Sequence, residues 1–202
     1  MPRFAANLSM LYTELPFLDR FAAAARSGFK AVEFLFPYDF APQEITQRLQ
    51  DHQLQLVLHN MPPGDWAAGD RGLAALPHRV DEFRASVAKA LDYAAALDTP
   101  QLHCMAGIPP ADVSTAQAHD TLVRNLHFAA DAARQQGARV LLEPINHFDM
   151  PGFFVNRPSQ ALAILDEVGA DNLFLLYDIY HAQRMEGELA STLRAHLPRI
   201  GH

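Results

Sequence analysis

The chain has 202 residues, of which 50% are hydrophobic and 19% charged, and its formal net charge is −7. This composition is that of a globular protein that is long enough to bury a sizeable core. The negative charge argues against binding to nucleic acid or to an anionic membrane. The sequence contains no apolar run of about 18 residues, the length that a membrane-spanning helix needs. The N-terminus lacks a signal-peptide pattern and Cys104 is the single cysteine, so we expect a cytoplasmic protein with a buried structural thiol.

Short apolar segments alternate with longer segments of helical periodicity along the chain. Strands are expected at 3–11, 31–37, 54–60, 101–107, 139–146 and 172–181, and helices at 15–28, 42–52, 78–97, 115–136, 157–169 and around Leu189, Leu193 and Leu197. The last residues, "RIGH", predict the start of another strand. Such alternation indicates parallel strands joined by right-handed crossovers, either in a doubly wound sheet or in a (β/α)₈ barrel.

The turn after the first strand favours the barrel. It reads "NLSMLYTELP" and contains none of the glycines that a doubly wound nucleotide-binding fold places there. We therefore predict an α/β fold of the (β/α)₈ TIM-barrel class, as one domain over residues 1–202. Because a complete barrel takes about 250 residues, we expect the barrel to be truncated after six βα units and the start of strand 7, with strands 7 and 8 missing. A six-stranded open relative is the alternative.

Polar residues gather at the expected carboxyl ends of the strands, where TIM barrels have their active sites. They are Asn7, Ser9, Glu33, His59, Asn60, His103, Glu143, Asn146, Asp178 and His181. Each alone is compatible with a capping or core role. Burying several of them together is costly unless they share a cation or a ligand, so a shared site is expected.

Glu143 and Asp178 form the sharpest pair, because each follows an apolar run, "VLLE" and "LFLLYD", on successive strands. Two adjacent carboxylates repel each other, which predicts a divalent cation between them. Oxygen ligands favour Mg²⁺ or Mn²⁺, and histidines near by would widen the choice to Zn²⁺ or Co²⁺. The alternative is that Arg157 and Arg184 neutralise the pair. His181 is expected at the strand end rather than on a helix, as a contact to the substrate or to a group that binds it.

The loop "PPGDWAAGDRG" holds the only tryptophan, Trp66. Glycines flank this residue, as in a lid over an active site, although an ordinary surface loop closed by the packing of Trp66 explains the pattern as well.

Five stretches together resemble the hydroxypyruvate isomerase family, in the xylose-isomerase-like group of TIM barrels. They are "RFAANLSMLYTE", "VEFLFPYD", "LHNMPPGDWAAGDRG", "EPINHFDMPGF" and "YDIYHAQRMEGEL", and they spread over nearly the whole chain. The resemblance implies an aldose–ketose isomerase, an intramolecular oxidoreductase, that interconverts hydroxypyruvate and 2-hydroxy-3-oxopropanoate (tartronate semialdehyde) in glyoxylate and carbohydrate-acid metabolism. The alternative is the similar 2-oxo-tetronate isomerase, which acts on a four-carbon oxo-acid.

The resemblance also implies roles for individual residues. Glu143 matches a metal ligand and acid/base residue, Asp178 matches a metal ligand, and Asp149 and His181 match positions that contact substrate. A further ligand on strand 7 and a second catalytic glutamate on strand 8 would lie beyond His202. The activity of residues 1–202 by themselves is therefore in question.

The mechanism that the resemblance implies is a metal-assisted proton transfer through an enediolate. One glutamate would remove the proton from the hydroxyl-bearing carbon and the other would return it to the adjacent carbon. His59, Asn60, Asn146 and His181 are the candidates for binding the carboxylate of the substrate. The expected partner is a small hydroxy- or oxo-acid, and binding to nucleic acid or to a membrane is not expected. The sequence leaves open whether the protein forms a homo-oligomer.

Two rival functions come from other classes. A metal-dependent endonuclease on the related barrel would also gather His, Asp and Glu at strand ends, but it would need more histidines and a basic surface, against a net charge of −7. A non-catalytic barrel that binds sugar acids is the second rival.

Overall fold

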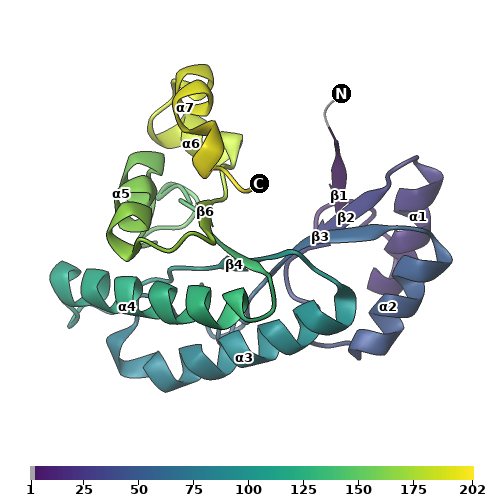
Figure 1. The fold of residues 1–202 in the computed structure, drawn as a ribbon, viewed down its shortest axis with the longest axis horizontal. Helices are drawn as coiled ribbons and strands as arrows, with labels where there is room; N and C mark the ends of the chain where they lie inside the picture. Colours follow the sequence, from purple (N-terminus) through teal and green to yellow (C-terminus); the bar gives the residue numbers. More distant parts are fainter. Residues whose placement is uncertain (1–2) are drawn as a thin grey trace.

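One curved parallel sheet organises the chain. The computed structural model describes residues 3–202. Its strands are β1 (Ala5–Asn7), β2 (Ala31–Phe34), β3 (Gln55–Asn60), β4 (Gln101–Cys104), β5 (Arg139–Leu142) and β6 (Leu173–Leu175). They lie in the order β1-β2-β3-β4-β5-β6, each parallel to the next, which is the strand order of a TIM barrel. β1 and β6 are the two edges of this sheet (Figure 1).

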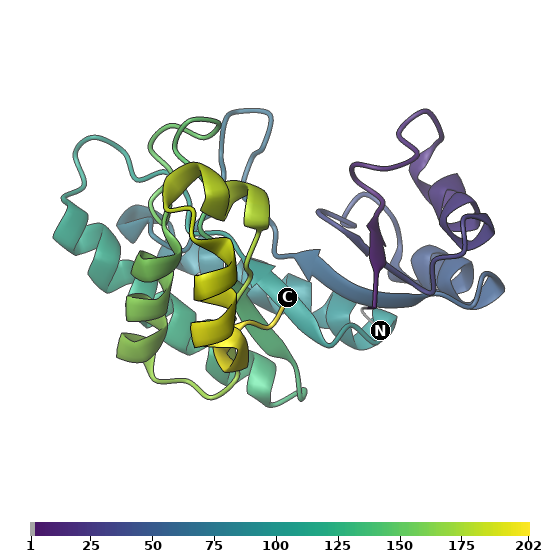
Figure 2. The same cartoon turned by 90° about the horizontal axis from the view of Figure 1, so that it is seen from above.

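The helices cover the convex side of the sheet. They are α1 (Arg20–Arg26), α2 (Pro42–Asp51), α3 (Val80–Leu97), α4 (Thr115–Arg134), α5 (Pro158–Val168), α6 (Ile179–Met185) and α7 (Leu189–His196), with 3₁₀ turns at Phe17–Asp19, Pro77–Arg79 and Leu197–Arg199. Helices α3 and α4 lie side by side under the middle strands, whereas α1 and α2 flank one end of the sheet and α5 to α7 the other (Figures 1 and 2). Within residues 3–202, none of these helices has the length and apolarity to cross a membrane.

The helix boundaries follow local chemistry. Helix α4 begins at a capping box, in which the Ser114 hydroxyl accepts a hydrogen bond from the backbone N–H of Gln117 and the Gln117 side chain accepts one from the backbone N–H of Ser114. Helix α3 buries Phe83, Val87 and Leu91, which recur every four residues on one face. The repeated apolar face explains why this helix packs along the sheet.

The predicted strand at 172–181 is much shorter in the structure. Strand β6 ends at Leu175, and the residues from Ile179 onward form α6. This helix begins there because the carboxylate of Asp178 accepts hydrogen bonds from the backbone N–H groups of Tyr180 and His181, which have no partner within the helix. The prediction that His181 lies at a strand end rather than on a helix is therefore wrong.

The segment after α7 returns to the sheet beside β6. Ile200 forms a parallel bridge with Leu175, and the N–H of Gly201 donates to the Leu175 carbonyl at 2.9 Å. A Cβ at Gly201 would lie 2.6 Å from Cδ2 of Leu141, so only glycine fits this close approach. The residues "RIGH", predicted to start another strand, thus pair with β6 through an isolated parallel bridge.

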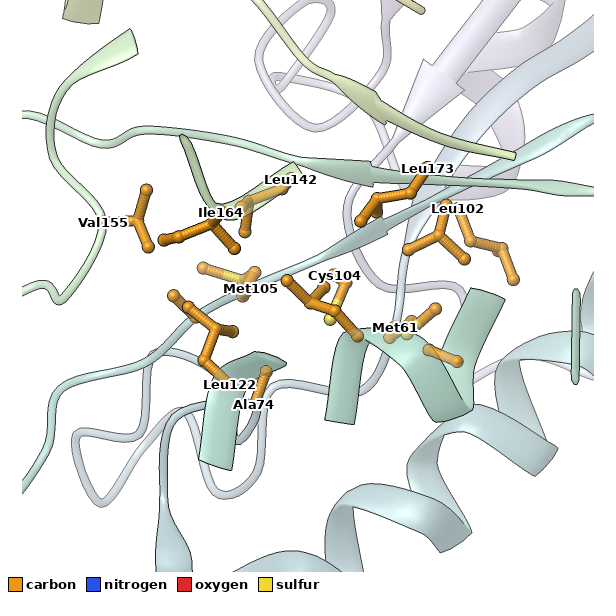
Figure 3. Packing of buried hydrophobic residues seen from close by; sticks show 14 of the residues in the cluster. Met61, Ala74, Leu102, Cys104, Met105, Leu122, Leu142, Val155, Ile164 and Leu173 are labelled. Carbon is orange, nitrogen blue, oxygen red and sulfur yellow. The ribbon is translucent and has the colours of Figure 1, made fainter. Parts of the chain in front are cut away.

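The main core lies between the sheet and the helices. Figure 3 shows Leu102 and Cys104 of β4 in one cluster with Leu142 of β5, Leu173 of β6 and Leu122 of α4. All five side chains are at most 3% exposed. A smaller cluster of Leu58, Leu141 and Leu176 lies on the other side of the sheet, and Leu58 and Leu176 line the cavity at the carboxyl ends of the strands.

The reactivity of the Cys104 thiol is a test of this packing. Its side chain is 1% exposed and burial raises the pKa of the thiol to about 12. We expect no reaction with Ellman's reagent at pH 8 in the native protein and one equivalent of reacted thiol in guanidinium chloride, because Cys104 is the only cysteine. Rapid stoichiometric labelling of the native protein would contradict this position for Cys104.

Candidate active site

A cavity of about 250 Å³ lies at the carboxyl ends of the strands. All six strands contribute a polar residue to its lining, at or just after the strand end: Asn7, Glu33, Asn60, His103, Glu143 and Asp178. Parallel strands that pair in sequential order bring these ends to a single mouth. Seven of the ten polar residues expected at strand ends line this single cavity, whereas Ser9, His59 and Asn146 do not.

Glu143, Asp178 and His181 form a cluster of potential metal ligands within this cavity. One potential ligand atom from each lies within 4.8 Å of the other two. Oδ1 of Asp178 accepts hydrogen bonds from the backbone N–H groups of Tyr180 and His181 at the start of α6. Oδ2 has no such partner among residues 3–202 and is free to bind a ligand. Because these groups come from consecutive strand ends and the adjoining helix, the backbone itself sets their spacing.

Burial and neighbouring carboxylates change the protonation of Glu143. Burial, joined by the negative charges of Asp178 and Glu33, raises its pKa from the ordinary 4.5 to about 8. His103 does not neutralise it, because burial and the proximity of His181 lower the pKa of His103 to about 3. Nε2 of His103 lies 3.5 Å from Oε2 of Glu143 without forming a hydrogen bond.

The two arginines considered as alternative partners of the carboxylate pair bind elsewhere. Nη1 of Arg184 lies 3.2 Å from Oδ1 of Asp149, and Nη1 of Arg157 donates to the carbonyl oxygen of Met185. The interpretation that they neutralise the pair is wrong. Two carboxylates that no arginine of residues 3–202 neutralises are a donor set that fits a hard divalent cation.

Glu33 adds a third carboxylate to the cavity. Oε1 accepts a hydrogen bond from Nδ2 of Asn7 at 3.0 Å, and Oε2 lies 2.6 Å from Nε2 of His202. The pairing of β2 with β3 shifts register between Val32 and Glu33, an irregularity of the kind that often re-aims a side chain near a site. The sequence predicted Asn7 and Glu33 as members of a shared site without an individual role for either, and His202 was not among the predicted site residues.

The predicted substrate-binding residues divide into two groups. Asn60, Asp149 and His181 line the cavity. His59 does not, because successive residues of a strand point to opposite faces and Asn60 faces inward. The buried His59 ring lies beside Tyr38, 6.2 Å between ring centroids, and burial lowers its pKa to about 4.

Asn146, also predicted to bind substrate, lies behind the cavity wall. It is fully buried, and its Nδ2 lies 2.7 Å from Nδ1 of His181. Asp149, its other neighbour, accepts hydrogen bonds from Asn146 and Tyr180, which hold the pKa of its carboxyl below the ordinary value. The structure thus places Asn146 against a cavity residue rather than in the cavity.

Trp66 lines the mouth of the cavity and is 40% exposed. The Arg71 guanidinium lies 3.9 Å from the centroid of its ring, and the ring of Phe36 lies 5.3 Å away on another loop. Asp70 links the loop to the 3₁₀ turn Pro77–Arg79, because it forms an ion pair with Arg79 at 2.7 Å. These contacts hold the indole beside the site, the position that the lid interpretation requires.

Comparisons with known proteins agree with this fold. Residues 21–202 match the family described as xylose isomerase-like TIM barrel. Over its full length the chain is 54% identical to the 2-oxo-tetronate isomerase of Cupriavidus necator and 50% identical to the hydroxypyruvate isomerase of Escherichia coli, and it covers 78% of each. The chain therefore belongs to the xylose isomerase-like TIM barrel family, which confirms the predicted fold class.

A solved structure shows the same architecture. It is described as an AP endonuclease, family 2, from Brucella melitensis, and it matches the whole chain with a TM-score of 0.98 at 46% identity, over 78% of that chain. An L-ribulose 3-epimerase shares the fold with a TM-score of 0.72 at 22% identity, over 100% of this chain and 68% of that one. The fold thus supports proteins with different names, and the function has to be argued from the site.

The raised pKa of Glu143 has a measurable effect on stability. Between the ordinary pKa of 4.5 and about 8, the folded protein holds a proton on Glu143 that the unfolded chain releases, so this group lowers the free energy of unfolding progressively as pH rises through that window. In metal-free protein, Glu143→Gln should therefore gain stability over wild type from pH 5 to pH 8, measured by thermal unfolding. Asp92→Asn, which changes an exposed side chain of α3 that forms no ion pair within residues 3–202, should show no such trend. Parallel curves for wild type and Glu143→Gln would contradict the assignment.

Proposed function

We propose that the protein is an aldose–ketose isomerase that interconverts hydroxypyruvate and 2-hydroxy-3-oxopropanoate. The observation that carries this proposal is Glu143, a largely buried carboxyl group whose pKa is raised to about 8, which lines a small cavity close to the carboxylate of Asp178. A general base works best when its pKa lies near the working pH and it is within reach of the proton. The isomerase relatives at 54% and 50% identity support the same reaction class.

A four-carbon substrate is the second candidate. The relative that is 54% identical is named 2-oxo-tetronate isomerase, and the relative named hydroxypyruvate isomerase is 50% identical, so identity alone does not separate the two acids. Both candidates carry a carboxylate, a carbonyl and a neighbouring hydroxyl, and a cavity of about 250 Å³ suits acids of this size.

Glu143 and Asp178 would hold a divalent cation, Mg²⁺ or Mn²⁺, between their carboxylates. The bound cation would stabilise negative charge on the oxygens of the substrate. Glu143 would move the proton at the hydroxyl-bearing carbon, Asn60, Asp149 and His181 would contact the substrate, and Trp66 would limit the access of water.

The complete protein is proposed to add strands 7 and 8, with the remaining ligand and the second glutamate. The share of each relative that the chain covers, 78%, supports this extension. We place the enzyme in the cytoplasm, in glyoxylate and carbohydrate-acid metabolism, with a small acid as its partner and without a nucleic acid. The assays below use the protein encoded by the whole gene.

Isomerisation is tested by proton NMR in D₂O, which follows exchange at the hydroxyl-bearing carbon. Glu143→Gln should lower turnover by about 10²- to 10⁴-fold, the contribution of a general acid or base, while the fold is kept. Glu167→Gln is the matched control and should turn over like wild type. Hydroxypyruvate and 2-oxo-tetronate are compared side by side, and an abasic-site DNA duplex should stay uncut. Full turnover by Glu143→Gln, or cleavage of the duplex, would overturn the proposal.

Cation binding is tested by thermal unfolding after treatment with EDTA. Mg²⁺ or Mn²⁺ at 100 times its dissociation constant stabilises the folded state by about 2.7 kcal/mol, which should raise the midpoint of wild type by roughly 5–10 °C. Asp178→Asn should lose this shift yet fold, because asparagine caps a helix as well as aspartate does. Asp120→Asn, on the exposed side of α4, should keep the shift. An equal shift in Asp178→Asn would exclude Asp178 as a ligand.

A further inference from the structure

Asn146 has a hydrogen-bond pattern that fixes the orientation of its side-chain amide. Its Oδ1 accepts hydrogen bonds from the backbone N–H groups of Phe148 at 3.1 Å and Asp149 at 3.0 Å. Backbone N–H groups only donate, so the oxygen of the amide must face them. The amide nitrogen, Nδ2, therefore points in the opposite direction, toward Asp149 and His181.

Both hydrogens of Nδ2 then have defined acceptors. One goes to Oδ2 of Asp149 at 2.9 Å and the other to Nδ1 of His181 at 2.7 Å. The backbone N–H of Asn146 points at the same Nδ1, at 3.5 Å. Two nitrogens of Asn146 that can only donate thus face Nδ1 of His181, so Nδ1 must be an acceptor and cannot carry a hydrogen.

A neutral imidazole with its lone pair on Nδ1 carries its hydrogen on Nε2. Among residues 3–202, Nε2 of His181 has no hydrogen-bond partner, and the His181 side chain lines the cavity beside Glu143 and Asp178. A histidine that ligates a metal normally shows the reverse pattern, because its second nitrogen donates to a carboxylate or a carbonyl. Because Asn146 donates a hydrogen bond to Nδ1, the hydrogen of the neutral ring is on Nε2, which then has no free lone pair for a metal.

We propose that Asn146 is a positioning residue that locks His181 in the Nε2–H form, so that His181 donates a hydrogen bond to a substrate oxygen and does not bind the metal. This inference rests on the proposed isomerase function for the identity of the acceptor. A neutral N–H donor aimed at an oxygen that becomes negative stabilises the transition state without transferring its own proton. Tyr180 and Arg184 support the arrangement, since both donate to Asp149 and hold it against the amide of Asn146.

The tautomer is read directly from ¹⁵N–¹H NMR of protein labelled on its histidine rings, in metal-free wild type, with the His181 signals identified by their loss in His181→Gln. We expect a protonated Nε2 and an unprotonated Nδ1, and the same pattern after addition of Mg²⁺. A hydrogen on Nδ1, or a transfer from Nε2 to Nδ1 on adding Mg²⁺, would overturn the proposal. This result is independent of turnover, so a protein that shows the tautomer but no isomerisation would refute the proposed function alone.

The second arm changes Asn146 itself. Asn146→Asp replaces the Nδ2 donor by an acceptor and should move the hydrogen to Nδ1, with a fall in kcat of about 10- to 100-fold and little change in KM. Asn156→Asp, in the same loop but outside this network, should keep both the tautomer and kcat. Asn146→Ala, which removes the donor without adding a charge, should also lower kcat. Unchanged kcat in a folded variant whose tautomer has moved would overturn the role of the donor.

Discussion

The site depends on one constraint, which is that the parallel sheet brings the partly buried carboxylates of Glu143 and Asp178 together, with no neutralising arginine among residues 3–202. Strands that pair in sequential order present their carboxyl ends side by side, so the backbone fixes this proximity. Burial raises the pKa of Glu143, and the charges of Asp178 and Glu33 act in the same direction. A folded chain that keeps such groups has either to hold a proton there or to bind a cation.

The surrounding structure keeps this arrangement rigid. Leucines on the concave face of the sheet support the cavity from below, and the larger cluster between sheet and helices fixes the strands. Around the mouth, Asp178 caps α6 and Asn146 holds His181, so that each group near the carboxylate pair has a set direction. The polar groups are thus placed by rigid elements and by a hydrogen-bond network rather than by mobile side chains.

In this protein, membership of the family establishes the fold, whereas the chemistry depends on individual residues of the site. The barrel is shared with an epimerase that is 22% identical, and that likeness concerns the fold alone. Relatives at 54% and 50% identity carry two substrate names within one reaction class. The distinction between a ligand and a hydrogen-bond donor at His181 lies at a finer level, since it depends on which amide atom of Asn146 faces the ring.

By itself, the sequence determined the order of strands and helices, the barrel class and the strand ends at which Glu143 and Asp178 lie, because hydrophobic periodicity and chain order are local properties. It did not determine where strands end: the N-cap formed by Asp178 turned a predicted strand into α6. Only the tertiary structure decided that Asn60 faces the cavity while His59 faces away, that Glu33 meets Asn7 and His202, and that Asn146 stands behind His181. Those relations depend on strand register and on contacts between distant segments, which no local pattern encodes.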